Sequence, residues 1–345
     1  MAITTQTKIA DIIQPELFAQ YVIDRTSEKS NLMYAGAVEN NPALNELVVG
    51  GGTVLTMPSW NDLSGKSEVL SESSDISVGK ITAKAELATL LIRAKAWGAH
   101  ELAGALAGDD PMKAIASLVA DWWVRDEKAN ILAILNGIFN ITADSSHKAL
   151  SDHVLNLATA ADNTALTDAM KISATAVLDA KQLMGDASDM LSMLYMHSAT
   201  YTALQKQNLI AFIPNARGEV VIPTYLGYRV VCDDSCPVEE AGTTGKTYKK
   251  YTTYLLSSGC IQRGTGIPTS ITPVETDRDS LGSTDILINR QAKVLHPRGI
   301  SWVGSGNITA STPSDDELAN KNSANNWSVV ADTKKIGIVK LVHTL

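Results

Sequence analysis

The sequence lacks a long hydrophobic run, an export signal and enough cysteines for a disulfide scaffold. Its longest apolar stretch, residues 131–141, is interrupted by two asparagines and a glycine and falls short of the ~18–20 residues that a membrane span needs. The N-terminal sequence MAITTQTKIADIIQ lacks the basic segment, apolar segment and small residues that follow one another in an export signal. We therefore expect the protein to fold in a cytosol. Cys232, Cys236 and Cys260 are too few and too clustered for a disulfide scaffold.

Charged residues are also scarce. They make up 19% of the chain against 45% hydrophobic residues, which is a composition that folds rather than one that stays disordered. The 29 basic and 37 acidic residues give a net charge of −8, which argues against nucleic-acid binding through a bulk basic surface. The length of 345 residues favours about two domains.

Phosphate-binding motifs are incomplete in this chain. The tripeptides at 245–247 (GKT) and 65–67 (GKS) resemble the end of a phosphate-binding loop. Glu240 and Trp60 stand where each motif needs its first glycine, and neither tripeptide follows a clear buried strand and opens a helix. Both tripeptides are therefore interpreted as turns with a solvated lysine.

Metal and nucleophile motifs are missing as well. The three cysteines would need a fourth soft ligand to bind zinc, and no histidine lies between residues 197 and 296. We interpret them as mostly buried free thiols in strands. No HExxH or GxSxG occurs, and Ser198 beside His197 is interpreted as a helix cap rather than half of a dyad. These patterns therefore assign no catalytic, cofactor-binding or metal-binding residue, although they do not exclude catalysis, because active sites assemble from distant residues.

The sequence around residues 53–88 predicts one long hairpin. Residues 53–58 are strand-like, residues 80–88 alternate polar and apolar, and a polar tract at 61–77 separates them. Arms of about 18 residues would extend ~60 Å, beyond a compact body whose radius of gyration would be ~20 Å. An isolated hairpin is marginal in water, so it needs its own domain or a neighbouring subunit to lie on.

The middle of the chain predicts helices. Asp109, Asp110 and Pro111 form a good helix start, and a helical apolar stripe continues to residue 139, a length of ~42 Å. Trp122 and Trp123 lie within this helix and are predicted to be core or interface residues. A second helix is predicted over residues 165–184, ended by Gly185.

The two ends of the chain differ from its middle. Residues 1–52 predict an arm with one short helix near residues 15–21 and no packed domain. Beyond residue 190 we predict a short helix at 198–207, an exposed loop at 233–246, and strands at 191–196, 219–223, 228–232, 251–256, 286–288 and 293–295.

This order of elements, together with four local stretches, resembles a known family. The stretches are MPSW at 57–60, WGAHEL at 97–102, MHSATYTALQKQ at 196–207 and HPRGISW at 296–302. Together they resemble the major capsid proteins of tailed double-stranded DNA bacteriophages, over roughly residues 5–305. None of these motifs is as specific as a zinc-finger spacing.

The resemblance implies an α+β protein with the Hong Kong 97-type capsid fold. Its parts would be an N-arm at 1–55, an extended E-loop at 56–90, a P-domain at 91–190 with a spine helix at 109–139, an A-domain at 191–265, a return to the P-domain at 266–305 and a C-terminal segment, 306–345, of unassigned role.

The resemblance also implies a structural function and no enzyme activity. That function is self-assembly into pentamers and hexamers of an icosahedral shell that encloses double-stranded DNA without sequence-specific binding. It implies partners other than the chain itself: a separate scaffolding protein, a portal and an optional decoration protein, and no membrane. The protein would be part of the virion capsid, assembled in the host cytoplasm.

Two groups of residues are implied as contacts between subunits. The E-loop residues are Asn61, Asp62, Lys66, Glu68, Glu72 and Asp75, and the residues of the capsomer-centre loop are Asp233, Asp234, Glu239, Glu240 and Lys246. Three alternatives stay open: an encapsulin-like compartment shell, a cytosolic α+β enzyme with an unrecognised site, and a tail or decoration protein of a virion.

Overall fold

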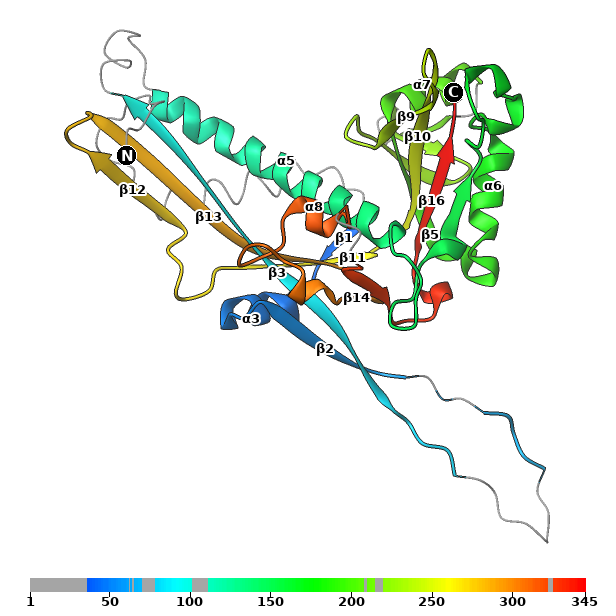
Figure 1. Cartoon of the computed structure of the whole chain (residues 1–345), viewed down its shortest axis with the longest axis horizontal. Helices are drawn as coiled ribbons and strands as arrows, with labels where there is room; N and C mark the ends of the chain where they lie inside the picture. The colour runs from blue at the N-terminus through cyan, green and yellow to red at the C-terminus, as the bar shows by residue number, and fades with distance from the viewer. Residues whose placement is uncertain are drawn as a thin grey trace.

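The computed structural model describes residues 36–61, 63, 65–69, 78–100, 111–207, 210–214, 220–321 and 325–345. One long helix, α5 (Pro111–Phe139), lies along one β-sheet, a second β-sheet lies at the C-terminal end of this helix, and a hairpin extends from the body (Figure 1). We call the first sheet the elongated sheet and the second the compact sheet.

The elongated sheet has the strand order β1-β11-β13-β3-β2, with β12 also paired to β13. Its longest members are β3 and β13, which run antiparallel from Thr284 opposite His100 to Val294 opposite Leu90. The bounds are β1 (Val38–Asn40), β2 (Val54–Trp60), β3 (Ala83–His100), β11 (Ile261–Gly266), β12 (Val274–Asp279) and β13 (Thr284–Pro297).

Helices cover both faces of the elongated sheet. Successive side chains on a strand point to opposite faces, so Leu90 packs in the cluster beneath α3 (Pro42–Gly50) while Leu91 joins the core around α5. Near the far end of the sheet, Trp123 of α5 is fully buried against Ala99 and Leu287. Its neighbour Trp122 is only half-buried, so of the two predicted core tryptophans Trp123 is the one at the centre.

The compact sheet has the order β4-β16-β10-β5-β8-β7-β6, with β9 paired to β10. Helices α6 (Ala174–Gln182) and α7 (Ser198–Lys206) pack on one face. The strand bounds are β4 (Val154–Asn156), β5 (Leu191–Met196), β6 (Ala211–Pro214), β7 (Val220–Tyr225), β8 (Tyr228–Cys232), β9 (Val238–Thr243), β10 (Lys246–Ser257) and β16 (Ile338–His343).

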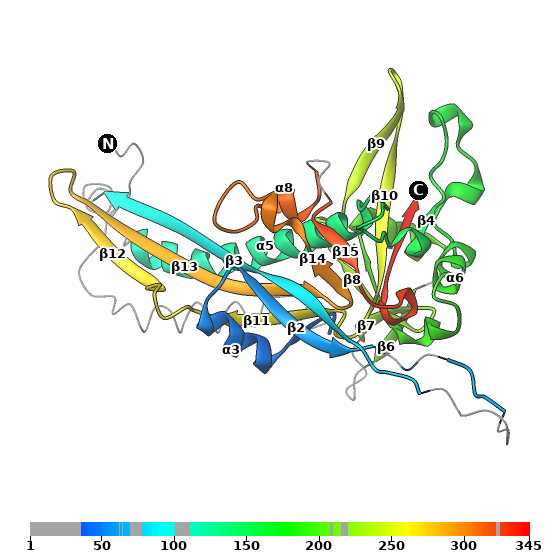
Figure 2. The same ribbon diagram turned by 60° about the horizontal axis from the view of Figure 1, so that its bottom comes forward.

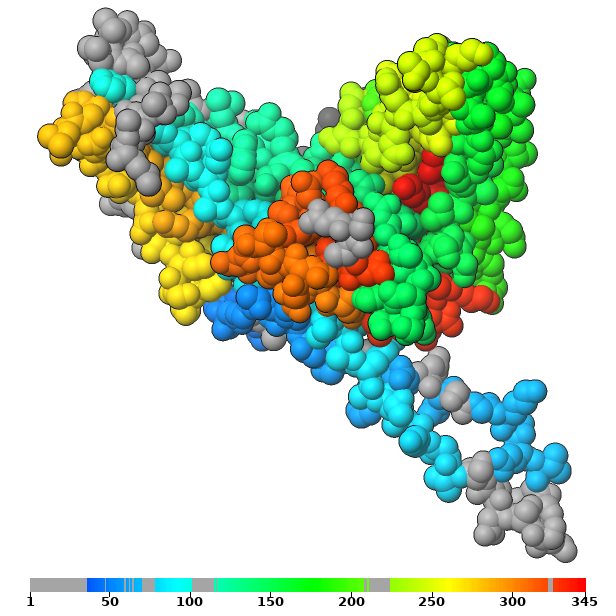
Figure 3. Space-filling view, in the orientation of Figure 1, coloured from blue at the N-terminus to red at the C-terminus, as the bar shows by residue number. Residues whose placement is uncertain are grey.

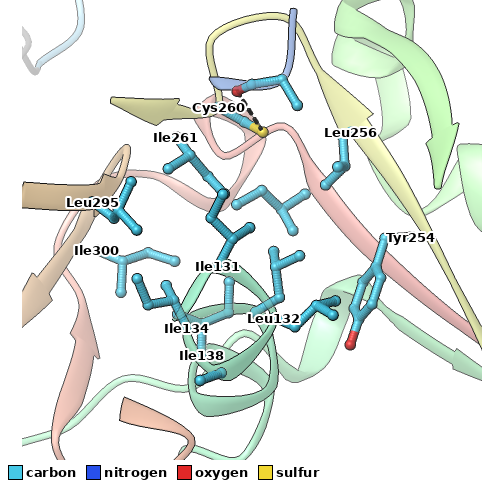
Figure 4. Packing of buried hydrophobic residues seen from close by; sticks show 14 of the residues in the cluster. Ile131, Leu132, Ile134, Ile138, Tyr254, Leu256, Cys260, Ile261, Leu295 and Ile300 are labelled. Atoms are coloured by element: carbon cyan, nitrogen blue, oxygen red, sulfur yellow. Dashed lines mark hydrogen bonds between the residues drawn. The ribbon is translucent and has the colours of Figure 1, made fainter. Parts of the chain in front are cut away.

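The second half of α5 joins the two sheets. Figure 4 shows Ile131, Leu132, Ile134 and Ile138 between strands of both sheets, with Tyr254 and Leu256 from the compact sheet and Ile261, Leu295 and Ile300 from the other side. Two polar contacts add to this packing. Tyr254 Oη donates to Asn136 Oδ1 at 2.9 Å, and Lys128 Nζ lies 2.5 Å from Asp233 Oδ2.

The C-terminal residues, whose role was unassigned from the sequence, add one strand to the compact sheet and a helix and a strand beside α5. β16 lies between β4 and β10 in the compact sheet. Helix α8 (Asp315–Leu318) packs on α5, and β15 (Trp327–Val329) pairs with β14 (Ile300–Trp302). Short 3-10 turns connect these elements, namely η1 (Ser151–His153), η2 (Asn163–Ala165), η3 (Asp168–Met170), η4 (Gly185–Met190), η5 (Gly304–Gly306) and η6 (Thr333–Lys335).

Several predicted elements need correction. The helix predicted at 165–184 is wrong in its first half, because η2 and η3 replace it and α6 begins only after the Ser173 cap. Residue 172 instead donates its N–H to the Thr344 carbonyl, so a contact with the distant C-terminus overrides local helix propensity.

Residues 36–50 are packed on the body, contrary to the predicted free arm. β1 runs parallel to β11, and Leu44 and Val48 of α3 are fully buried. The short helix predicted near residues 15–21 lies outside the described residues. The two late strands predicted at 286–288 and 293–295 form one strand, β13.

Candidate assembly surfaces

The β2–β3 hairpin is the first candidate surface, because its outer part leaves the body. β2 pairs with β3 from Val54 opposite Thr89 to Trp60 opposite Ala83, and Asn61 N–H extends the ladder by donating to Thr82 O at 2.9 Å. Beyond this pairing, the blue and cyan segments extend clear of the body (Figures 1 and 3). The regular hairpin is thus shorter than the arms of 18 residues expected from the sequence.

Apolar side chains are exposed along this outer part. Trp60 is 69% exposed, Val69 93% and Val78 96%, and Ile81 is also exposed. Scattered single apolar residues on a surface are ordinary, but several large ones on one thin projection cannot bury each other. Such a segment is suited to lie on another surface.

The root of the hairpin, by contrast, is fixed to the body. Glu86 Oε2 accepts hydrogen bonds from His296 Nε2 (3.3 Å) and from the Gly299 N–H (3.1 Å), and the Leu87 N–H donates to Ser301 Oγ at 3.0 Å. The hydrogen bond from His296 lowers the pKa of Glu86, so the carboxylate stays ionised. These contacts, which we call the root clasp, set the direction in which the hairpin leaves.

The structure describes three of the six residues predicted for the E-loop. Lys66 and Glu68 are exposed on the outer hairpin. Asn61 is exposed too, but it closes the ladder through Thr82. Asp62, Glu72 and Asp75 lie outside the described residues.

The second candidate surface replaces the loop predicted at 233–246. β9 and the first half of β10 form a two-stranded hairpin, paired from Val238 opposite Tyr251 to Thr243 opposite Lys246. Gly245 has φ +80°, a conformation that glycine adopts without strain in a two-residue turn. We call this hairpin, residues 238–250, the β9–β10 ribbon, and Figure 2 shows it standing out from the compact sheet.

The five residues predicted for the capsomer centre divide between the tip and the base of this segment. Glu239, Glu240 and Lys246 are exposed on the ribbon, whereas Asp233 is buried at its base. Burial alone would raise the pKa of Asp233, but Lys128 and the Ser235 N–H hold it below its usual value. Asp233 is therefore a link to α5, and its prediction as an exposed loop residue is wrong.

Asp234 is exposed but contacts the start of α7. Its Oδ1 accepts from the Ser198 N–H at 3.3 Å. His197, rather than the predicted Ser198, is the cap, because its Nδ1 accepts the Ala199 N–H at 3.0 Å.

The described residues offer no cluster of metal ligands, and two of the three cysteines are buried. They contain no group of three or more histidine, cysteine or acidic side chains that could hold a metal ion. Burial raises the pKa of the Cys260 thiol to about 12 and also raises that of Cys236, so neither is a ready nucleophile. Cys232 is exposed at the end of β8, contrary to the buried position expected for it. None of the described helices is both long and apolar enough to cross a membrane.

Comparison with known proteins assigns this chain to a protein family. The family described as "Gp13-like: Major capsid protein 13-like" matches residues 130–337. The major capsid protein of Bacillus phage SPP1 is 41% identical over 343 residues, which cover 98% of each chain. The chain belongs to the major capsid protein 13-like family. It is a structural protein of a tailed-phage virion and not an enzyme.

Solved structures show that this capsid protein has the Hong Kong 97-type α+β fold. The capsid of Ralstonia phage GP4 matches with a TM-score of 0.57 at 7% identity, over 99% of this chain and 95% of that one. The capsid of cyanophage Pam1 matches with a TM-score of 0.55 at 10% identity, over 99% and 96%. The fold and the capsid function implied by the resemblance are confirmed, whereas the enzyme and encapsulin-like alternatives are not supported.

Some of the contacts at these candidate surfaces carry no signal in the sequence. Glu86 and His296 are 210 positions apart, and Lys128 and Asp233 belong to different elements, so only the folded chain brings them together. The β9–β10 ribbon did carry a signal, since a glycine turn between two β-capable segments is typical of a hairpin.

Proposed function

We propose that this capsid protein forms rings of five and six copies that close into an icosahedral shell around double-stranded DNA. That it assembles with copies of itself follows from its family. The ring sizes, the packaged DNA and assembly in the host cytoplasm are the proposed part. The acidic net charge of −8 suits a container that does not attract DNA with a basic lining.

The observation that carries the proposal is the outer part of the β2–β3 hairpin. It projects from the body with Trp60, Val69 and Val78 largely exposed, while the root clasp holds its direction. We propose that it acts as the E-loop and lies across a neighbouring copy, with Lys66 and Glu68 in the contact. Each contact can be modest, because many contacts around a closed shell reinforce one another through effective concentration.

The remaining parts are assigned in the same way. We propose that the elongated sheet with α5 is the P-domain and that the compact sheet, including β16, is the A-domain with the β9–β10 ribbon near the ring axis. Residues 1–55 would be the N-arm, of which residues 36–50 already pack on the P-domain. A separate scaffolding protein, a portal and an optional decoration protein are proposed partners.

Particle mass and shape test the proposal. The full chain is expressed alone and together with the product of the neighbouring gene, then studied by sedimentation and negative-stain imaging. Closed polyhedral shells, or rings of five and six, are expected. A stable monomer or dimer under both conditions would contradict the proposed assembly.

A matched pair of substitutions tests the part played by the hairpin. Trp60→Ala removes the largest exposed apolar side chain of the outer hairpin, and Leu281→Ala removes one that is 99% exposed in the turn between β12 and β13. If the hairpin lies across a neighbour, Trp60→Ala lowers the yield of shells at unchanged folding. Equal yields for Trp60→Ala and the unmodified chain would show that Trp60 is not in a contact.

A further inference from the structure

The charges of the β9–β10 ribbon are separated by strand. β9 carries Glu239 and Glu240 and no cation, whereas residues 246–250 of β10 carry three lysines and no acid. Glu240 lies opposite Lys249, and Glu239 opposite Lys250. Side chains that lie directly opposite each other share a face of the ribbon. Each of these two cross-strand pairs therefore joins an acid to a lysine, and the two long edges of the ribbon differ, the β9 edge being acidic and the β10 edge basic.

Both edges are open in the part of the chain that the structure describes. β9 pairs with β10 alone, and β16 pairs with β10 only from Tyr251 to Leu256, beyond the lysines. Glu239, Glu240, Lys246 and Lys249 are all exposed. An open strand edge is a surface to which another chain can dock, and a two-stranded ribbon in water is marginal without such support.

One face of the ribbon is anchored, which fixes where the edges point. Tyr248 is buried, and its hydroxyl donates to the carbonyl oxygens of Ala158 (3.2 Å) and Ala160 (2.7 Å). Lys246 Nζ lies 4.0 Å from Asp162 Oδ2, at an exposed position, where an ion pair contributes little. The ribbon is thus held upright by the body while its charged edges stay accessible.

We propose that the acidic edge of one copy's ribbon meets the basic edge of the next copy's ribbon around each ring. The inference rests on the proposed function, which places the ribbon near the ring axis. A surface with opposite charges on its two sides complements a rotated copy of itself head to tail, and such heterologous contacts close into rings. Two like edges brought together repel, so the charges also oppose a two-fold pairing of ribbons.

Two variants whose ribbons carry mainly a single sign of charge test this contact. Glu239→Lys with Glu240→Lys leaves no acidic residue on the ribbon, and Lys246→Glu with Lys249→Glu makes the ribbon acidic, with Lys250 as its one remaining lysine. Either variant alone presents like charges at every contact in a ring, so we expect at least a tenfold loss of rings under conditions in which the unmodified chain assembles. Circular dichroism of the separate variants checks that they fold.

Mixing the two variants separates contacts between copies from contacts within one copy. In a 1:1 mixture an acidic ribbon can alternate with a basic one around a ring of six, so six-membered rings should return. A ring of five cannot alternate, so closed shells that need five-membered rings should stay absent. The fourfold variant E239K/E240K/K246E/K249E reverses the net charge of both edges, with Lys250 left unchanged, and is the matched control, expected to assemble by itself.

The outcomes are distinct. Rescue by the fourfold variant but not by the mixture would mean that the charges act within one ribbon, which overturns the inference. Closed shells from either single-sign variant alone would overturn it too. The salt dependence of ring formation is an independent measurement. Because salt screens exposed charges, the unmodified chain should form fewer rings as the salt concentration rises from about 0.05 to about 0.5 M. An unchanged ring yield would contradict the contact. Failure of the unmodified chain to form any ring counts against the proposed function instead.

Discussion

At the scale of single residues, Gly137 shows how closely the C-terminal segment approaches α5. A Cβ atom on Gly137 would lie 1.9 Å from the Leu318 carbonyl oxygen and 2.8 Å from Trp327 Nε1. The same carbonyl accepts the Trp327 indole N–H at 2.8 Å. Because Gly137 has no side chain, α8 can pack closely on α5 and Trp327 can donate to the Leu318 carbonyl.

Gly137→Ala is expected to lower the free energy of unfolding of the subunit by about 1–3 kcal/mol, the usual cost of overpacking. This cost would exceed the gain of about 1 kcal/mol that alanine brings to a helix interior. Chemical denaturation of the unassembled subunit measures it. Gly50→Ala is the matched control, because open space surrounds Gly50 at the end of α3. A Gly137→Ala subunit at least as stable as the parent would show that α8 can move away.

His343 makes stability depend on pH. It is fully buried on β16, with Nε2 3.0 Å from Thr253 Oγ1, and burial lowers its pKa from 6.5 to about 4. The unfolded chain therefore binds a proton more readily than the folded one between these two values. Stability is complete above pH 6.5 and falls as the pH decreases toward 4, by at most about 3 kcal/mol.

Denaturation between pH 7 and pH 4 tests this dependence in the unassembled subunit. His343→Gln should flatten the curve relative to the unmodified chain. Some slope should remain, because burial also lowers the pKa of His153. Identical slopes for the variant and its parent would show that folding does not change the pKa of His343.

At the scale of elements, the root clasp makes a prediction about the hairpin. Glu86→Gln keeps the shape of the side chain but removes the charge that His296 and the Gly299 N–H contact. We expect hydrogen exchange at Leu87 and Gly299 to accelerate about tenfold, which corresponds to a loss of about 1.4 kcal/mol of local stability. Glu46→Gln, at an exposed position on α3, is the control.

Acid should loosen the same clasp in the unmodified chain. The pKa of Glu86 is lowered from its ordinary value of 4.5, so its contribution is present above that value and is lost as the pH falls through the lower folded value. Unchanged exchange in Glu86→Gln at neutral pH would show that backbone pairing alone holds the root.

Elements were predictable where local pattern and tertiary contacts agree. The strand at 191–196 and the strand at 228–232 were predicted with the bounds that β5 and β8 have, because apolar alternation there coincides with burial. The helix predicted at 109–139 matches α5, which is described from Pro111.

Prediction failed where distant contacts decide. Residues 170 and 172 lie in a stretch of helix-forming composition but hydrogen-bond to Thr344 near the C-terminus. The loop predicted at 233–246 failed for another reason, because the local hairpin signal of its glycine turn was not used. The candidate residues on the outer hairpin were implied by the family resemblance, and of these Asn61, Lys66 and Glu68 are exposed. The link between Asp233 and Lys128 joins two elements, and no local spacing records it.

At the scale of the whole molecule, the root clasp separates folding from assembly. The pairing from Val54 to Trp60 and the contacts of Glu86 are made by residues outside 61–77, so we expect the subunit to fold without residues 61–77. Deleting residues 61–77 leaves the five residues 78–82, including Gly79, between the paired strands. A loop of that length can close a hairpin.

The deletion is therefore expected to give a folded subunit that forms no closed shell. Circular dichroism and a cooperative denaturation curve would check folding, and electron microscopy would check particles. A second variant, in which a glycine-serine segment of equal length replaces residues 61–77, keeps the reach of the hairpin and removes its apolar side chains such as Val69. If both variants fold and neither closes shells, the side chains of the outer hairpin make the contact. Intact particles from the deletion would show that shell closure depends on other surfaces of the body.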